Sequence, residues 1–474
     1  MSLELKIAEL NKIEQQGLAV FEFDNINWWP LIRIYLFQNH EVQKKTSIDK
    51  KTLIYPKRVL WEIRIWREQK KRYRYIKSIN LNEIKKADAL YLTSETNYKK
   101  DASGKFINRF LDPLYLKANE SKTILVRSKI QEGSYVVSDL YATEFFELKL
   151  KLKKQCLVVS RTLFFLPDAS KYSNKHKLSI DALINYIKSF PYFTNFNFNK
   201  LPKWFDDVFE SHDVAKLIFQ KTQPKQFIQY CYYFPAQFGY TLAANSMHIT
   251  SVDYQHGIQN KFHYGYGSWV NVPQQGYKLL PNEFWVFSER EKNNLLNSFS
   301  NSSHKIKVIG NAWVDYWKEH KTNFKNLEWL HHIKSKGLRV VLYTVSNYLI
   351  DKNHFFWQYL QHNNTDKLFF LFRLHPGHTY LNDALLSQLR ETNFSNYNID
   401  DATKTELYDL IEECDIHVTQ NSTVAEEALY LNKSTIIIDP KWSIYFENYI
   451  SNGDMFVANT INDFEDLIHK KLSI

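Results

Sequence analysis

Short apolar runs alternate with amphipathic stretches along most of this 474-residue chain. Near its start, residues 87–94 and 122–128 have the apolar pattern of buried strands. Three more strand-like runs, at 248–257, 283–289 and 305–311, follow helical patterns. Strands that alternate with helices predict an α/β fold whose parallel sheet is covered on both faces.

The alternation starts again after a polar stretch around residues 318–336. The second set of predicted elements comprises a helix at 423–432 and strands at 338–346, 367–377, 415–420 and 434–439. The restart predicts two α/β units in series. Because ligands bind beyond the carboxyl ends of strands in open α/β sheets, the residues that follow these strands are the first candidates for a site.

Polar residues follow three of the later strands, in the segments "RLHPG" (373–377), "NIDDATKTE" (398–406) and "TQNST" (419–423). His375 comes at the exit of an apolar strand, beside Arg373, and Pro376 then turns the chain and fixes the direction of the histidine. A histidine in this place can donate to a phosphate oxygen, and its charge is tunable near neutral pH. The alternative is a histidine that bonds a neighbouring loop carbonyl.

The segment "TQNST" has two interpretations, a helix cap and an anion-binding site. Thr423 and Glu426 have the spacing of a capping box, as do Thr403 and Glu406, so both pairs are expected to begin helices. Capping explains one of the three small polar residues in a row, and not all of them.

If Thr423 caps, Asn421 and Ser422 remain beside the unpaired N–H groups at the positive end of a helix, which favours an anion. We therefore predict that Asn421, Ser422 and Thr423 bind phosphate.

In the first half, Gln255, His256 and Gly257 follow a predicted strand, and Lys261 lies close by in sequence. Gly265 and Gly267 are expected to let the backbone approach a ligand. Gly310 and Asn311 end the next unit of the pattern, as a ligand contact or as a plain turn.

Composition and net charge indicate what class of partner the protein binds. Hydrophobic residues make up 44% of the chain and charged residues 24%, as in folded soluble proteins, and the length predicts two or three domains. The formal charge is +10, which favours an anionic partner such as a nucleic acid, a phosphorylated molecule or a membrane surface. Cys156, Cys231 and Cys414 form no metal pattern, and a reducing compartment is expected.

The basic stretch 57–77 holds nine Lys and Arg residues, with apolar residues near helical spacing between them. It predicts either a helix on an anionic bilayer or an ordinary solvated helix. No signal peptide or membrane-spanning segment is recognised, so the expected location is the cytoplasm, either free or peripheral at the inner face of the inner membrane.

Several common motifs are missing from the sequence. There is no Walker motif, no G-x-G-x-x-G after the first strand, no G-x-S-x-G, no H-E-x-x-H and no D-x-D. The remaining prediction is a metal-independent phosphate site without a cofactor, built from a helix start, a histidine and hydroxyl groups.

The segments "QHG", "FWVFSEREK", "KVIGNAWVD", "RLHPG" and "ELYDLIEECDIHVTQNSTVAEEAL", in this order over about 250–440, resemble GT-B glycosyltransferases of bacterial capsule and lipopolysaccharide synthesis. The resemblance implies two Rossmann-like domains with parallel sheets facing across a cleft, an acceptor-side domain at 1–320 and a nucleotide-donor domain at 321–474.

The H-P motif with a later Ser-Thr pair is similar to transferases that use CMP-activated acidic sugars, and also to the teichoic-acid polymerases. On that resemblance His375, Pro376, Arg373, Ser422 and Thr423 would hold the donor phosphate, with Gly257, Gly310 and Asn311 as further donor contacts. The sequence lacks a clear D/E-D/E-G motif of the sialyltransferases.

An inverting transferase needs a base that deprotonates the acceptor hydroxyl, and the candidates are Asp112, Glu95 and His256. Asp112 is equally an ordinary residue at a helix start before Pro113, and His256 is either base or donor contact. The alternatives are a UDP-, GDP- or CDP-linked donor, a GT-B sugar epimerase, or a basic nucleic-acid-binding protein, although no nucleic-acid-binding motif is present.

Overall fold

The computed structural model describes residues 3–17, 19–39, 86–93, 98–100, 106–118, 123–127, 145–147, 172–320, 327–346, 348–362 and 366–473. The chain divides into two compact units, with unit 1 ending at Trp313 and unit 2 beginning at Val314. This division falls within the helix α11 (Ala312–His320). The predicted domain boundary, after residue 320, lies at the end of the same helix. Glu95 and the basic stretch 57–77 lie outside the described residues.

The described part of unit 1 contains a parallel seven-stranded sheet in the order β11-β10-β9-β8-β3-β6-β7. Its strands are β3 (Ala89–Thr93), β6 (Thr123–Arg127), β7 (Phe145–Glu147), β8 (Gln226–Gln229), β9 (Thr250–Tyr254), β10 (Glu283–Val286) and β11 (Lys305–Val308). Numbered along the chain, the order is 7-6-5-4-1-2-3, the doubly wound arrangement of a Rossmann-like sheet. The five predicted strands of this half are confirmed; β7 and β8 were not predicted.

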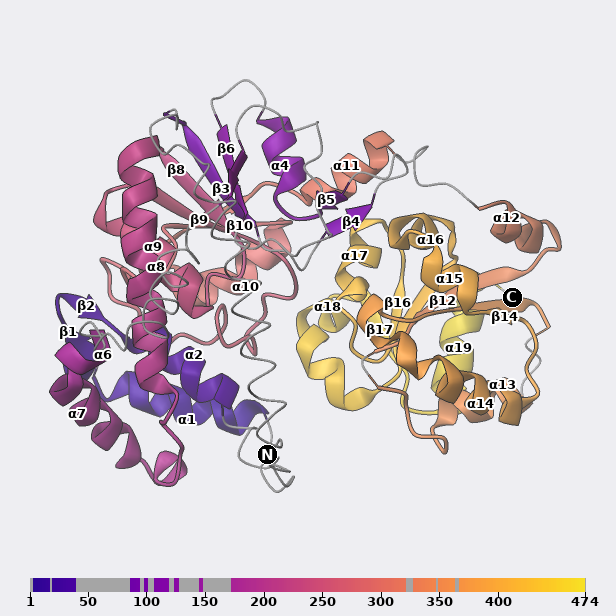
Figure 1. The fold of residues 1–474 in the computed structure, drawn as a ribbon. Coiled ribbons are helices and arrows are strands. Elements are labelled where there is room, and N and C mark those ends of the chain that lie inside the picture. Colours follow the sequence, from indigo (N-terminus) through magenta and orange to yellow (C-terminus); the bar gives the residue numbers. More distant parts are fainter. Residues whose placement is uncertain are drawn as a thin grey trace, which may run out of the picture. The chain divides into compact units, whose positions relative to one another are not determined.

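Helices cover both faces of this sheet (Figure 1). The helices among the described residues of unit 1 are α1 (Leu3–Gln15), α2 (Trp29–Asn39), α4 (Asp112–Lys117), α6 (Tyr172–Lys175), α7 (Lys177–Lys188), α8 (Leu201–Thr222), α9 (Pro235–Ser246) and α10 (Glu289–Phe299), with short 3-10 turns at Ala19–Phe21 and Pro191–Phe193. Two small antiparallel pairs complete it: β1 (Glu22–Phe23) with β2 (Ile26–Asn27), and β4 (Tyr98–Lys100) with β5 (Phe106–Asn108).

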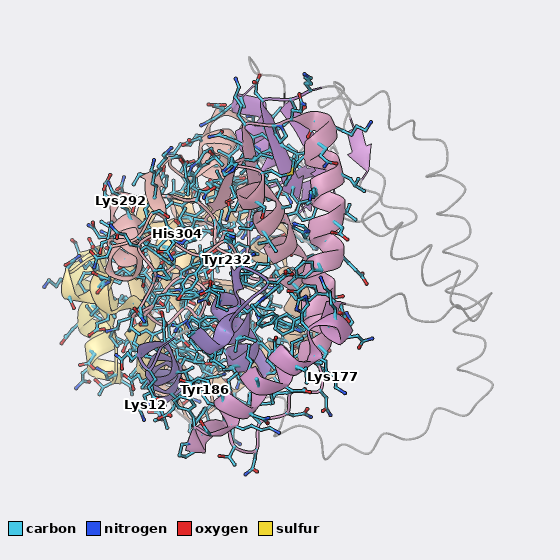
Figure 2. All side chains as sticks on the ribbon, turned by 90° about the vertical axis from the view of Figure 1, so that its left-hand side faces the viewer. Lys12, Lys177, Tyr186, Tyr232, Lys292 and His304 are labelled. Atoms are coloured by element: carbon cyan, nitrogen blue, oxygen red, sulfur yellow. The ribbon has the colours of Figure 1, made fainter. Side chains whose placement is uncertain are left out.

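Alternation along β3 shows how the sheet is buried on both sides. Leu90 packs in a cluster with residues of α8 and α9, whereas Tyr91 packs in a different cluster that includes Leu111 of the segment leading into α4. Side chains on successive strand residues point to opposite faces, so both faces of this strand are apolar. Figure 2, which draws the side chains as sticks, labels Tyr232, which is fully buried, and Lys177 of α7, which is exposed.

The helices α1 and α2 hold the segment that follows β9. Arg33 of α2 and Glu14 of α1 form a fully buried ion pair of 3.0 Å. The other guanidinium nitrogens of Arg33 donate to the carbonyls of Gly267 and Ser268, each at 3.0 Å, and of Tyr264 at 3.4 Å. The N-terminal helices are therefore integrated with the loop that carries "QHG".

Unit 2 contains a second parallel sheet in the order β14-β13-β12-β15-β16-β17. Its strands are β12 (Arg339–Thr344), β13 (Leu368–Arg373), β14 (Tyr397–Asn398), β15 (Ile416–Thr419), β16 (Thr435–Ile437) and β17 (Met455–Val457). Numbered along the chain, the order is 3-2-1-4-5-6, so unit 2 is also Rossmann-like. The four strands predicted here and the helix at 423–432 are confirmed.

The helices of unit 2 are α12 (Glu328–Ser335), α13 (Phe355–His362), α14 (Asn382–Thr392), α15 (Asp400–Lys404), α16 (Leu407–Glu413), α17 (Val424–Tyr430), α18 (Glu447–Ser451) and α19 (Ile461–Leu472), with 3-10 segments η8 (Pro376–Leu381) and η9 (Pro440–Phe446). Phe356 of α13 and Phe464 of α19 pack in one core cluster with Phe370 and Phe372 of β13. Within the described part of the chain, no helix is long and apolar enough to cross a membrane.

Candidate functional site

In the sheet of unit 2 the strand order changes direction between β12 and β15. Ser346 and the segment "TQNST" lie at the carboxyl ends of these two strands. Thr419 at the end of β15 donates to the Thr344 carbonyl at 3.0 Å, and Ser346 donates to the side-chain oxygen of Asn421. Open α/β sheets bind ligands at such a switch point. "TQNST" therefore lies at the place in unit 2 that the topology favours for a ligand.

The predicted capping box of Thr423 is wrong. Thr423 makes no side-chain capping bond and has helical backbone angles. Ser422 takes the capping position instead, because its hydroxyl oxygen accepts from the N–H of Val424 at 3.3 Å. Glu426 accepts from the Tyr449 hydroxyl at 2.8 Å. The assumption that Asn421 and Ser422 are left unused by the fold is therefore also wrong: both are hydrogen-bonded.

The second predicted capping box, Thr403 with Glu406, is wrong as well. Thr403 lies inside α15, and its hydroxyl accepts from the N–H of Leu374 at 3.2 Å. Arg373 is also used by the fold, because its guanidinium donates to the carbonyls of Ala402, at 2.5 Å, and Thr405. These bonds fasten the end of β13 to the turn between α15 and α16.

His375 is exposed at the start of η8, where Pro376 turns the chain. Its Nδ1 accepts from the N–H of Gly377 at 3.0 Å, which in the neutral ring leaves the hydrogen on Nε2. This bond fixes the direction of the ring. One strand, β12, separates β13 from β15, so the backbones at His375 and "TQNST" are about two strand spacings, or roughly 10 Å, apart.

Gln420 was not recognised from the sequence. It follows β15 directly and is completely buried, yet neither its side-chain oxygen nor its nitrogen has a hydrogen-bond partner among the described residues. Leaving a buried polar group unpaired costs about 1–3 kcal/mol. The buried amide of Gln420 is therefore a further candidate site residue at the switch point.

In unit 1, Asn108 and Asp112 build the turn that precedes α4. The Asn108 side chain accepts from the N–H groups of Phe110 and Leu111, each at 3.1 Å, and Asp112 accepts from the Asn108 N–H at 2.8 Å. Asp112 lies inside the first turn of α4, whose cap position is Leu111. Its carboxylate is fully buried and has this local structural role.

His256 lies in an aromatic cluster beside that turn. Its Nε2 is 2.9 Å from the Tyr233 hydroxyl, and its ring centroid is 6.0 Å from that of Phe110 and 6.2 Å from that of Tyr230. Tyr230 in turn accepts from the Asn108 side chain at 3.3 Å. Burial, together with the positive charge of Arg109, lowers the pKa of His256 to about 4. His256 is therefore neutral at physiological pH.

Two polar groups of the loop after β9 lack partners. The Nδ1 of His256 is shielded from solvent and, like both side-chain polar atoms of Gln259, has no hydrogen-bond partner among the described residues. Gln259 is almost fully buried. Spacing alone gave no reason to select Gln259, because its burial depends on the loop conformation.

The prediction that Gly265 and Gly267 admit a ligand is wrong, because the protein's own atoms fill those places. A Cβ on Gly267 would lie 2.2 Å from the Asn260 carbonyl oxygen, and a Cβ on Gly265 would lie 2.9 Å from the ring of Tyr233. Gly257 differs: nothing lies within 4 Å of an added Cβ, so the space beside this glycine is open.

Gly310 and Asn311 form the turn into α11. Gly310 has a φ of +83°, and its carbonyl accepts from the Tyr254 hydroxyl at 3.2 Å. The Asn311 side chain accepts from the Trp313 N–H at 3.2 Å. Of the two readings left open, these bonds describe a turn that fastens the end of β9, and a donor contact here stays a prediction.

No protein-family profile and no curated protein matches this chain. Among solved structures it is similar to a UDP-GlcNAc 2-epimerase of Neisseria meningitidis bound to UDP-GlcNAc, at 14% identity and a TM-score of 0.46 over 82% of this chain and 92% of that one. It is also similar to MurG of Acinetobacter baumannii (8%, 0.42, 81% and 90%) and to the α,α-trehalose 6-phosphate synthase of Burkholderia multivorans (7%, 0.45, 82% and 89%).

At these identities and TM-scores the similarities carry no argument about the fold or the activity of this chain. The class of the chain follows from its own sheets: it is an α/β protein with two parallel Rossmann-like sheets, as predicted. Each sheet carries buried or fixed polar groups beyond its strand ends.

Proposed function

We propose that this protein is a metal-independent glycosyltransferase that uses a nucleotide-activated sugar, with a CMP-linked acidic sugar as the expected donor and a surface glycan as the acceptor. The observation that carries the proposal is the carboxyl edge of unit 2. There His375 and Ser422 flank the switch point, beside the unsatisfied amide of Gln420.

The chemistry of this edge suits a leaving nucleotide. The Nε2–H of His375 and the hydroxyl hydrogen of Ser422 are donors to phosphate oxygens, since a serine that accepts one bond still has its own hydrogen to donate. Cleavage of the glycosidic bond places charge on the departing phosphate. Donors that are already oriented stabilise that charge without reorganising. Asn421 supports Ser422 indirectly, by tying the loop to Ser346.

For the base we favour His256 over Asp112. A tautomer with hydrogen on Nε2 donates to the Tyr233 oxygen, which leaves the Nδ1 lone pair to accept the proton of an acceptor hydroxyl. The carboxylate of Asp112 already accepts a bond from the backbone of its own turn. Glu95 stays a candidate outside the described residues.

Product analysis tests the proposal. Purified protein is incubated with CMP-, CDP-, UDP- and GDP-sugars and a glycan acceptor in the presence of EDTA, and the products are separated by chromatography. A transferase releases free nucleotide and extends the acceptor, and His375→Ala and Ser422→Ala should each lower the rate at least tenfold. Conversion of the donor sugar into its epimer, with no extension of the acceptor, would assign the alternative sugar epimerase instead.

A further inference from the structure

We propose that Arg109, His256 and Gln259 form a binding site in unit 1 for an acidic sugar, with the carboxylate or phosphate of that sugar facing Arg109. This proposal extends the proposed function, because it names the class of ligand that unit 1 binds. It rests on the proposed function only in identifying that ligand as the acceptor. Binding itself can be measured without turnover.

The backbone at Arg109 is fixed. It lies between Asn108, which accepts from the N–H groups of Phe110 and Leu111, and Asp112, which accepts from the N–H of Asn108. The guanidinium carbon of Arg109 lies 4.7 Å from the centre of the Phe110 ring. A cation over an aromatic ring is held in place by that contact. Among the described residues, no carboxylate forms an ion pair with Arg109.

The charge of Arg109 acts on His256. The Phe110 ring that supports the guanidinium also stands perpendicular to the His256 ring, 6.0 Å away between centroids. The positive charge of Arg109 also contributes, after burial, to the lowered pKa of His256. The cation and the unpaired Nδ1 therefore belong to one cluster.

The other titratable groups around His256 are phenols, a second imidazole and two hydrogen-bonded carboxyl groups, and burial raises the pKa of Asp253 to about 7. Tyr230, Tyr233 and Tyr266 are phenols, and burial lowers the pKa of His263 to about 3. Asp253, buried below them, already accepts from the Tyr266 hydroxyl at 2.6 Å and from the Tyr232 N–H at 3.0 Å. Asp112, in the turn of Arg109, accepts from the N–H of Asn108.

An acidic sugar matches each feature of this cluster. A guanidinium pairs with carboxylate and phosphate through parallel N–H bonds. An amide such as that of Gln259 both donates to and accepts from sugar hydroxyls, and aromatic rings pack on the apolar face of a sugar ring. Free phosphate would leave the amide and the rings unused, and a neutral sugar would leave Arg109 without an anion.

Isothermal titration of the full chain, without nucleotide, tests the site with three probes: glucuronate, glucose 6-phosphate and glucose. We expect at least one acid to bind ten or more times more tightly than glucose, and the better acid identifies carboxylate or phosphate. Arg109→Met should lose at least tenfold in affinity for that acid, and Arg109→Lys less. Lys216→Met, which removes an exposed positive charge from α8, is the matched control and should bind like the wild type.

A second readout follows the imidazole of His256 by NMR. An anion beside this ring should raise its pKa, so binding should take up a proton and strengthen as the pH falls. Failure of both acids to bind, equal binding of glucose, or wild-type affinity in Arg109→Met would overturn the site. If the protein binds nucleotide but neither acid, this inference fails while the proposed function stands. If it binds an acid but no nucleotide, the reverse holds.

Discussion

Replacing Arg33 by methionine tests how the N-terminal helices support the loop after β9. Arg33 and Glu14 are both fully buried and lie 3.0 Å apart. Methionine keeps much of the side-chain length but removes the charge, so the carboxylate of Glu14 and the carbonyls of Tyr264, Gly267 and Ser268 lose their common donor. Glu14 keeps the bonds from the N–H groups of Val270 and Asn271.

Removing one partner of a buried ion pair costs about 3–5 kcal/mol, because the other charge stays buried without compensation. Unfolding entropy grows with size, so in a unit as large as unit 1 each kcal/mol lowers the Tm by about 1.5 °C, and we expect a loss of roughly 5–8 °C. Differential scanning calorimetry should show this loss in the transition of unit 1. The control is Lys203→Met, which removes an exposed pair with Asp207 and should cost about 0–1 kcal/mol.

The double variant Arg33→Met with Glu14→Gln separates charge from packing. Removing the uncompensated charge should recover about 1–3 kcal/mol relative to the sum of the two single variants. If Arg33→Met costs no more stability than Lys203→Met, or if the losses of the two single variants simply add, the buried pair of Arg33 and Glu14 does not stabilise unit 1 as described.

Three further predictions concern backbone fit, capping and pH. Gly267→Ala should cost at least about 1–3 kcal/mol in denaturant titrations, since its Cβ meets the Asn260 carbonyl, whereas Gly257→Ala has open space and should change stability by less than about 1 kcal/mol; equal costs would contradict the loop geometry. Ser422→Ala should cost about 0.5–2 kcal/mol by losing the helix cap, and Thr423→Ala less than that; the opposite ranking would restore the capping box. Burial lowers the pKa of His417 to about 3, well below its unfolded value of about 6.5. The unfolded chain therefore binds the proton first, and stability is lost as the pH falls from about 6.5 toward 3. In His417→Gln, urea titrations at pH 7.5, 6 and 5 should show a shallower loss toward acid; an unchanged slope would exclude His417 as a source.

The alternation of apolar runs and helical patterns was sufficient to predict two α/β units. Runs such as "LRVVLYTVS" and "KLFFLFRLHPG" are long enough to identify β12 and β13. The strand β8 was not predicted, because "QFIQ" is short and begins and ends with glutamine, although it lies in the middle of its sheet. Its neighbours, rather than its own sequence, make it a strand.

The details at the strand ends could not be predicted from spacing. Thr423 and Glu426 have the spacing of a capping box, but the N–H of Val424 donates to the hydroxyl of Ser422, so the side-chain cap lies one residue before Thr423. Gln259 and Arg109 carry no motif at all. Gln259 stands out by its burial, and Arg109 by its contact with Phe110, whose ring meets that of His256 across more than a hundred positions of sequence.

Nucleotide binding by the intact protein tests the central claim most directly. CMP, CDP, UDP and GDP are titrated into the wild type, His375→Ala, Ser422→Ala and Thr403→Ala in the presence of EDTA, and affinity is measured by calorimetry. We predict that a cytidine nucleotide binds most tightly, that binding survives EDTA, and that His375→Ala and Ser422→Ala each weaken it at least tenfold while Thr403→Ala does not. Binding of no nucleotide, or wild-type affinity in both His375→Ala and Ser422→Ala, would show that these residues do not form a nucleotide phosphate site.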